Sequence, residues 1–270
     1  MTTTRRFGLI GNPLQHSKSA EYFTQKFISQ GLHDCRFDLF PILLDPQNVS
    51  TLLPQLIQQH HLLGFSVTIP YKQLVLPLLY TISPEAQAIG AVNSVKVDWS
   101  APDPQRGFPF RLHGHNTDAP AFAQTLRPLL RPWHTQALIL GTGGASLAVH
   151  YALKSMGIQP LFVSRSPELY NQSHPNLTQA ISYSQAFHLS SRIFLIVNTT
   201  PLGTFPKVEA TPWVNIRNLS PRHLCYDLVY NPEETRFLLE SHLAGAQTQN
   251  GLPMLHLQAD LSWAIWNSTN

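Results

Sequence analysis

The amino-acid sequence predicts an α/β fold built from two domains. Stretches with the apolar pattern of strands alternate with stretches of helical periodicity along most of the chain. In the middle, the apolar run 137–140 leads into Gly141-Thr-Gly-Gly-Ala145, and residues with helical spacing follow. This order of strand, glycine turn and helix opens a Rossmann-type dinucleotide-binding unit. The elements before residue 118 alternate without this turn, so they predict a separate α/β domain.

The composition argues against several classes of protein. A chain of 270 residues is long enough for two medium domains. The net charge of +3 and the lack of a Lys/Arg run argue against nucleic acid as a partner. No stretch approaches the roughly 18 apolar residues of a membrane span. Cys35 and Cys225 have neither metal nor redox spacing, which favours a reducing compartment, and we expect the cytoplasm.

The elements of the first domain follow from apolar patterns and turn residues. A helix should begin at Ser19, carry Tyr22, Phe23, Phe27 and Ile28 on one face, and end before Gly31. The remaining elements expected here are strands at 5–11, 35–40, 62–68, 91–99 and 110–116, and helices at about 48–60, 71–80 and 84–89.

The second domain should start with a linking helix from Asp118 to Leu130. After the glycine turn and its helix, strands are expected at 161–165, 193–197 and 224–230. The last twenty residues predict an amphipathic helix that carries Trp263 and Trp266.

The glycine turn is the first candidate binding site. Gly141 can adopt the backbone angles of a tight turn, and Gly143 and Gly144 let a pyrophosphate approach the helix N–H groups. An ordinary glycine-rich turn is the alternative, because the motif is a variant of the strict fingerprint. Arg165 lies where an NAD enzyme usually has an acidic residue, which suits the 2′-phosphate of NADP; a surface arginine is the alternative.

Three further positions are candidates for chemistry. Lys72 follows a strand that Pro70 ends, so it is either a proton donor or base, or a solvated lysine. Asp118 is either a functional carboxylate or a helix N-cap. Ser17 and Ser19 either cap a helix or hold a substrate carboxylate at its start. The thirteen histidines include neighbouring pairs, but no Asp, Glu or Cys completes a metal site, so no metal is expected.

Eight short motifs follow one another along nearly the whole chain: Gly-Asn-Pro-x-x-His-Ser-x-Ser (11–19), Val-Thr-Ile-Pro-Tyr-Lys (67–72), Gly-Ala-Val-Asn-Ser (90–94), Asn-Thr-Asp (116–118), Gly-Thr-Gly-Gly-Ala-Ser (141–146), Asn-Thr-Thr-Pro-Leu-Gly (198–203), Tyr-Asp-Leu-Val-Tyr-Asn-Pro (226–232) and Gly-Leu-Pro-Met-Leu-x-x-Gln-Ala (251–259). In these motifs and their order, the sequence resembles the shikimate dehydrogenase family.

The resemblance implies two domains around a cleft, namely 1–118 with 252–270 for substrate and 119–251 for NADP. It implies reversible NADPH-dependent reduction of 3-dehydroshikimate to shikimate, with Lys72 and Asp118 as the catalytic pair. The positions that match the family's substrate-binding groups are Ser17, Ser19, Thr68, Asn93, Asp118, Tyr230 and Gln258. Those that match positions around the dinucleotide are Gly141, Thr142, Gly143, Gly144, Ala145, Ser146, Ser164, Arg165, Thr200, Leu228, Gly251 and Met254.

Some residues depart from the family pattern. The second basic residue that often follows the Arg165 position is Leu169, with Glu168 beside it, and the usual Gln-Ala-Ala is Gln-Ala-Asp260. Two alternatives therefore stay open: an NAD-preferring dehydrogenase of the quinate or shikimate type, and a catalytically silent binding protein of the same fold. The expected partner is a small-molecule substrate, and the expected assembly is a monomer or a homodimer.

Overall fold

The computed structural model describes residues 4–175, 177–212 and 216–268. The chain divides into two compact units. Unit 1 is Met1–Thr117 with His256–Asn270, and unit 2 is Asp118–Leu255. The sequence placed the two boundaries at 118 and 252. Which unit takes substrate and which takes NADP stays a prediction.

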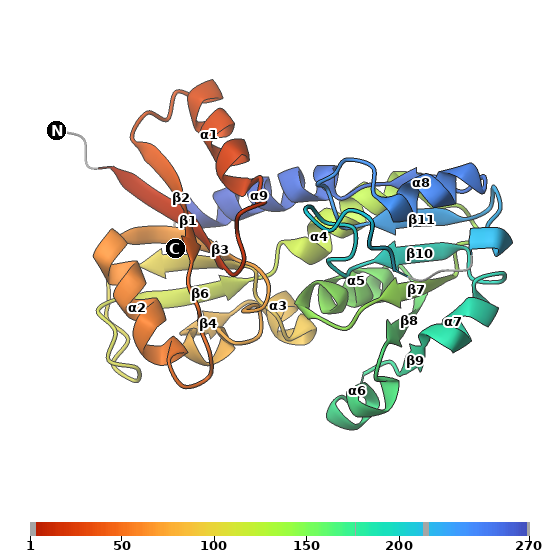
Figure 1. Ribbon diagram of the computed structural model, residues 1–270. Coiled ribbons are helices and arrows are strands. Elements are labelled where there is room, and N and C mark those ends of the chain that lie inside the picture. Colours follow the sequence, from red (N-terminus) through yellow and green to blue (C-terminus); the bar gives the residue numbers. More distant parts are fainter. Residues whose placement is uncertain (1–3, 176, 213–215, 269–270) are drawn as a thin grey trace. The chain divides into compact units, whose positions relative to one another are not determined.

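Unit 1 is an α/β unit around one mixed sheet (Figure 1). In the described residues this sheet has six strands in the order β2-β1-β3-β5-β6-β4. Their bounds are β1 Arg5–Gly11, β2 Cys35–Pro41, β3 Leu62–Val67, β4 Thr81–Ile82, β5 Ser94–Asp98 and β6 Arg111–His115. Strand β5 runs antiparallel to its neighbours β3 and β6, while the other pairs are parallel.

Helices pack on both faces of this sheet because strand side chains alternate between faces. Phe7 and Leu9 of β1 belong to a core with α1, Ser19–Ser29, and α9, Leu252–Trp266. Ile10 of the same strand belongs to a second core with α2, Val49–His60. The third helix, α3 (Pro84–Ile89), begins where the Ser83 hydroxyl accepts a hydrogen bond from the Ala86 N–H.

The helix expected at 71–80 is wrong. Only a 3₁₀ turn forms there, η1 at Leu76–Leu78. Pro77 explains the difference, since it has no N–H to donate to the carbonyl oxygen of residue 73 and so interrupts an α-helix at this point. Ile28 is also not on the buried face of α1: its side chain is 68% exposed, whereas Phe23 and Phe27 are buried.

Unit 2 contains a parallel sheet of the dinucleotide-binding type. Among the described residues its strand order is β12-β11-β10-β7-β8-β9, which read from the other end is the 3-2-1-4-5-6 order of the Rossmann fold. The strands are β7 Gln136–Leu140, β8 Gln159–Ser164, β9 Ala180–Ser182, β10 Leu195–Asn198, β11 Leu224–Asp227 and β12 Gln247–Gln249. The strand expected at 224–230 therefore stops at Asp227, where the side chain begins to bond the following loop.

The helices of unit 2 alternate with these strands (Figure 1). They are α4 Asp118–Leu126, α5 Gly144–Ser155, α6 Pro167–Ser173, α7 Tyr183–Leu189 and α8 Arg236–Leu243, with 3₁₀ turns η2 Arg127–Leu129 and η3 Ile216–Asn218. The linking helix was expected to reach Leu130 but becomes 3₁₀ at Arg127, next to Pro128. Helix α9 starts in unit 2, and its residues from His256 onward belong to unit 1.

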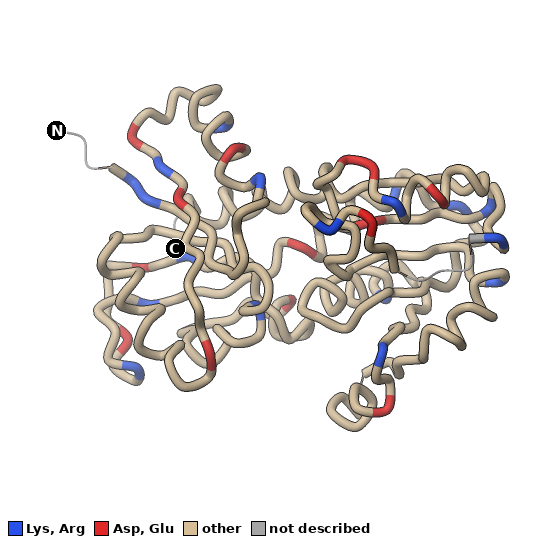
Figure 2. Tube along the Cα trace, viewed as in Figure 1, with Lys and Arg blue, Asp and Glu red and all other residues tan. Residues whose placement is uncertain are grey.

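The charged residues are few and dispersed. Figure 2 shows Lys and Arg spread among the elements of each unit, with Asp and Glu residues between them. In the described part of the chain, no helix is both long and apolar enough to cross a bilayer.

We expect the stability of the fold to fall as the pH drops below neutrality. Burial lowers the pKa of five histidines: His113, His115, His134, His150 and His223. The pKa of His150, which bonds Thr178 and stacks on Phe162, falls from 6.5 to about 4. Because the pKa of His150 is lower in the folded state, the stability that its neutral form contributes is fully present above pH 6.5. That contribution is lost as the pH falls toward 4.

Urea unfolding at several pH values between neutral and acidic measures this effect. The His150→Gln variant should lose less stability on acidification than the wild type. The variant lacks the imidazole that, between pH 6.5 and about 4, binds a proton in the unfolded chain but not in the folded one. Substitution of the exposed His188 by Gln is the matched control. Equal pH slopes for the wild type and His150→Gln would contradict the assignment.

Candidate functional site

Four of the loops that carry predicted site residues meet at one edge of the unit 1 sheet. Strands β1, β3 and β6 end at this edge, and β5, which runs antiparallel to β3 and β6, begins there. These four strands are consecutive neighbours in the sheet. Residues that follow β1, β3 and β6 and residues that precede β5 are therefore placed side by side, although they are far apart in the sequence.

The loop after β1 lies against the loop after β3. A Cβ atom at Gly11 would overlap the methyl group of Thr68, so only glycine permits this approach. The Asn12 N–H also donates to Ile69 O, at 3.2 Å. Ser17 and Ser19 follow in this loop: the Ser17 hydroxyl accepts a bond from the Ser19 N–H at 3.3 Å, and Ser19 is the buried first residue of α1.

Lys72 is fixed through its main chain. Its carbonyl oxygen accepts a 2.8 Å hydrogen bond from the Val92 N–H, which places Lys72 beside the segment that leads into β5. The side chain of Lys72 is half-buried. In the same segment, the Asn93 N–H bonds His115 O, and Asn93 O accepts from the Val67 N–H. The residues after β3, before β5 and at the end of β6 are thus tied together by backbone bonds.

Asn93 is the centre of a buried polar network. Its Oδ1 accepts a bond from the Thr117 N–H at 2.7 Å, and its Nδ2 donates to Thr117 Oγ1 at 2.9 Å. The same Nδ2 lies 3.5 Å from Gln258 Oε1 of α9, and Thr117 Oγ1 lies 3.1 Å from Ser262 Oγ of that helix. Asp118 follows Thr117 directly and is the buried first residue of α4. This network explains why Asn93 and Gln258 lie at one site.

In unit 2 the glycine turn joins β7 to α5. Gly141 has φ = 112°, which a side chain would strain, and a Cβ there would lie 2.9 Å from Thr199 Oγ1. The Ser146 hydroxyl accepts from the Gly143 N–H at 3.1 Å and lies 2.6 Å from Thr199 Oγ1. Nothing lies within 4 Å of the Cβ position of Gly143, so a ligand can reach the backbone. The N-terminus of the twelve-residue α5 supplies N–H groups suited to an anion.

This turn lies at the point where the strand order reverses. Strands β7 and β10 are neighbours in the sheet. The chain passes from β7 to β8 on one side of this pair and from β10 to β11 on the other side. Dinucleotides bind at such a point, outside the carboxyl ends of the strands. Gly141, Thr142, Gly143, Gly144, Ala145 and Ser146 follow β7 here, and Thr200 follows β10.

A buried carboxylate organises the loops after β10 and β11. Asp227 accepts bonds from Asn198 Nδ2, the Val229 N–H and the Thr235 hydroxyl, at 2.9, 3.0 and 2.6 Å. Burial raises the pKa of Asp227 to about 6, and these three donors partly oppose that rise. Asn198 Oδ1 in turn accepts from both the N–H and the hydroxyl of Thr200.

The remaining predicted residues of unit 2 follow β11 or begin α9. Leu228 N–H donates to Asn198 O at 2.9 Å, and Tyr230 lies half-buried two residues further on. A Cβ at Gly251 would overlap Leu228 O, so glycine is required where the chain enters α9. Met254 is a buried residue in the first turn of that helix.

Arg165 follows β8 at the same edge as the glycine turn. Its side chain is exposed, and Ser164 Oγ accepts from the Ser166 N–H at 3.1 Å to shape the turn. Burial raises the pKa of Tyr183, at the start of α7, and the positive charge of Arg165 partly opposes this rise. An exposed cation at the end of the second strand is suited to an anionic group on a bound nucleotide.

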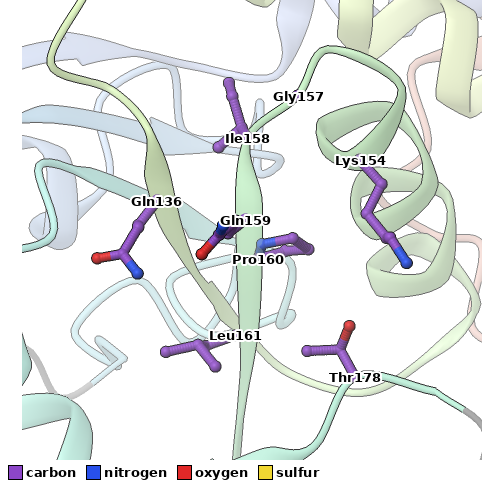
Figure 3. Close-up of a pocket in the computed structure, with 8 residues that line it drawn as sticks. All are labelled: Gln136, Lys154, Gly157, Ile158, Gln159, Pro160, Leu161 and Thr178. Carbon is purple, nitrogen blue, oxygen red and sulfur yellow. The ribbon is translucent and has the colours of Figure 1, made fainter.

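A cavity of unit 2 lies away from these residues. A hollow of about 430 Å³ is lined by Gln136, Lys154, Gly157, Ile158, Gln159, Pro160, Leu161 and Thr178, at the amino ends of β7 and β8 (Figure 3). None of the predicted site residues lines it, and it lies at the edge of the sheet opposite the glycine turn. Among the described residues, no three His, Cys, Asp or Glu side chains come together as metal ligands would.

Comparison with known proteins shows the family of the chain. Residues 9–95 match the family described as "Shikimate dehydrogenase substrate binding domain". The shikimate dehydrogenase (NADP(+)) of Carboxydothermus hydrogenoformans is 33% identical, with 99% of this chain and 93% of that protein covered. The chain belongs to the shikimate dehydrogenase family.

Solved structures of this family have the same fold. The shikimate 5-dehydrogenase of Thermus thermophilus, solved with NADP(H) and shikimate, matches with a TM-score of 0.78 and 31% identity, covering 98% of this chain and 94% of that one. A quinate dehydrogenase from Corynebacterium glutamicum, solved with NAD, matches with a TM-score of 0.79 and 25% identity, covering 98% and 94%. The fold is α/β, with a Rossmann-type unit 2, as the sequence predicts.

Sequence reasoning missed the residues that support these sites. Thr117, Ser262, Asn198 and Asp227 were not singled out, although all four are buried and hydrogen-bonded within their units. Three of them lie inside the motifs that carry the resemblance, at positions next to or between the predicted site residues. Ser262 had no such signal, because only the folded chain brings α9 to β6.

Proposed function

We propose that this chain catalyses the reversible NADPH-dependent reduction of 3-dehydroshikimate to shikimate, a step of aromatic amino-acid biosynthesis. The observation that supports the proposal is that the loops carrying Ser17, Thr68, Lys72 and Asn93 lie at one edge of the unit 1 sheet, in a member of this family. The reaction is reduction of a ketone in one direction and oxidation of the CH–OH group in the other. Bound NADPH would supply the hydride for the reduction, and NADP+ would accept it in the reverse direction.

Lys72 and Asp118 are the proposed catalytic residues. Reduction of a ketone leaves negative charge on its oxygen, and an ammonium group can stabilise that charge and donate the proton. Asp118 is the proposed partner that orients this ammonium group. In the reverse direction, Lys72 takes the proton from the C3 hydroxyl of shikimate.

The substrate is a compact ring with one carboxylate and several hydroxyls. Ser17 and Ser19, at the N-terminus of the eleven-residue α1, are suited to the carboxylate because hydroxyls and helix N–H groups both donate to anions. For the ring hydroxyls we propose the polar side chains Thr68, Asn93, Asp118, Tyr230 and Gln258.

The dinucleotide fits the residues of unit 2. Gly141 and Gly143 leave the backbone of the β7–α5 turn accessible, and the N–H groups at the start of α5 would hold the pyrophosphate. Arg165, with Ser164 beside it, is proposed to bind the 2′-phosphate that distinguishes NADP from NAD. Thr200, Leu228, Gly251 and Met254 are the proposed contacts from the loops after β10 and β11 and from α9.

An absorbance assay at the reduced-nicotinamide band tests the proposal directly. Shikimate and quinate are each supplied with NADP and with NAD. We expect the highest kcat/KM with shikimate and NADP. A higher value with quinate and NAD would favour the dehydrogenase of that type, and no turnover with any pair would favour a binding protein of the same fold.

The paired serines make a separate prediction. Replacing both Ser17 and Ser19 by Ala should raise the KM for shikimate roughly tenfold or more, since two hydrogen bonds to a charged group are lost. The KM for NADP should not change. An unchanged KM for shikimate would mean that the serines only support the start of α1.

The cellular compartment and the oligomeric state of the enzyme also remain predictions. We expect it to act in the cytoplasm, as a monomer or a homodimer. Cys35 and Cys225 are both free thiols, which fits a reducing compartment. Light scattering of the purified protein would give the assembly state.

A further inference from the structure

A polar cluster joins helices α1 and α9 of unit 1. Lys26 Nζ lies 2.7 Å from Asp260 Oδ1, and the Tyr22 hydroxyl donates to the same oxygen at 2.6 Å. The ring of Tyr22 also stacks on His256, with centroids 4.6 Å apart. Two donors on one carboxylate oxygen, from one face of α1, define the position of α9 more narrowly than apolar contact does.

The cluster is partly removed from water. The side chain of Lys26 is 14% exposed and that of Asp260 is 43% exposed. Burial and the bond to Asp260 both raise the pKa of Tyr22, so its hydroxyl stays protonated and donates. Loss of the Asp260 carboxylate would leave a mostly buried ammonium without this acceptor, which is unfavourable.

Both helices carry proposed substrate groups close to the cluster. Tyr22 and Lys26 are one turn apart on α1, whose first residue is Ser19. Asp260 is two residues after Gln258 on α9, so the two side chains leave the helix on different faces. Gln258 lies within 3.5 Å of Asn93 while Asp260 bonds α1, and rotation of α9 would therefore disturb both contacts.

The apolar contacts between the helices are less directional than the hydrogen-bonded cluster. Phe27 of α1 packs on Trp263, with ring centroids 5.1 Å apart, and Phe23 lies 5.5 Å from Trp266. Such ring contacts tolerate small shifts, whereas a charge-assisted hydrogen bond is sensitive to distance and direction.

We propose that Asp260 is a positioning residue for the substrate site, which holds α1 and α9 in register through Lys26 and Tyr22. By fixing the two helices, it sets the spacing between the hydroxyls of Ser17 and Ser19 and the amide of Gln258. This inference rests on the proposed function, because it assumes that those groups bind shikimate.

The test measures shikimate binding and catalysis separately. Asp260→Ala and Lys26→Met should each raise the Kd for shikimate, measured by calorimetry without cofactor, and its KM by roughly 3- to 10-fold. The kcat and the KM for NADP should stay within about twofold, and Asp260→Glu should restore most of the affinity. The Kd of the double variant for shikimate should be no higher than that of the weaker-binding single variant, because both changes break the same Lys26–Asp260 ion pair.

A second ion pair of unit 1 provides the control. Arg5 Nε lies 2.8 Å from Asp34 Oδ2 at the start of β1, at the sheet edge opposite the proposed site. Asp34→Asn should leave shikimate binding unchanged. An unchanged Kd in Asp260→Ala, or a fall in melting temperature with an equal loss of NADP affinity, would overturn the positioning role. Failure of the wild type to bind shikimate would instead overturn the proposed function.

Discussion

Substitution of Lys72 by Ala is expected to lower the kcat for shikimate oxidation by a factor of about 10² to 10⁴, the usual contribution of a positioned acid or base. The fold should not change, because the hydrogen bond from the Val92 N–H to the Lys72 carbonyl oxygen is a main-chain bond that the variant keeps. Steady-state kinetics with saturating NADP, together with shikimate binding by calorimetry, separate the loss of turnover from any loss of affinity.

Lys154→Ala is the matched control for this variant. Lys154 is an exposed lysine near the end of α5, at the edge of the unit 2 sheet opposite the glycine turn. Its replacement should leave kcat unchanged. Normal turnover in Lys72→Ala would remove Lys72 from the mechanism, and the assignment of Asp118 as its partner would then have no basis.

Substitution of Arg165 by Ala should weaken the use of NADP by roughly 10- to 100-fold in KM, which is the loss of one or two hydrogen bonds to a phosphate. The KM for NAD should change little, because NAD lacks the 2′-phosphate. The measurement is the ratio of kcat/KM values for the two cofactors, each with shikimate. Leu169 and Glu168 offer no second cation, so the preference should depend strongly on Arg165.

Arg192→Ala provides the comparison. Arg192 is exposed and precedes β10, at the opposite edge of the same sheet, so its loss should leave the cofactor ratio unchanged. An equal loss for NADP and NAD in Arg165→Ala would mean that the guanidinium does not contact the 2′-phosphate. The basis of cofactor choice would then lie elsewhere in unit 2.

Much of the candidate site was predictable because the signals are local. The glycine turn requires a glycine at Gly141, where φ is 112°, and the strand and helix beside it have clear apolar periodicity. Lys72 and Asp118 each follow a strand with a strong pattern. The helix expected at 71–80 was wrong because Pro77 outweighs the apolar periodicity around it, and the strands at 180–182 and 247–249 are too short to carry a pattern.

The unexpected carboxylate of Asp260 shows what local patterns leave open. Asp260 is the only Asp, Glu, Lys or Arg between residues 252 and 266 of the sequence, and nothing near it in the chain explains it. Its partners Tyr22 and Lys26 are 238 and 234 residues away from it in the sequence.

The sequence by itself determined the α/β class, the Rossmann-type unit and the residue types available for chemistry, because periodicity, glycine turns and caps act over a few residues. The tertiary structure decided which of these residues meet. The antiparallel β5 brings Asn93 to the edge where β3 and β6 end, and the return of α9 brings Gln258 and Asp260 to unit 1. Such contacts depend on strand order and helix packing, which are properties of the whole chain.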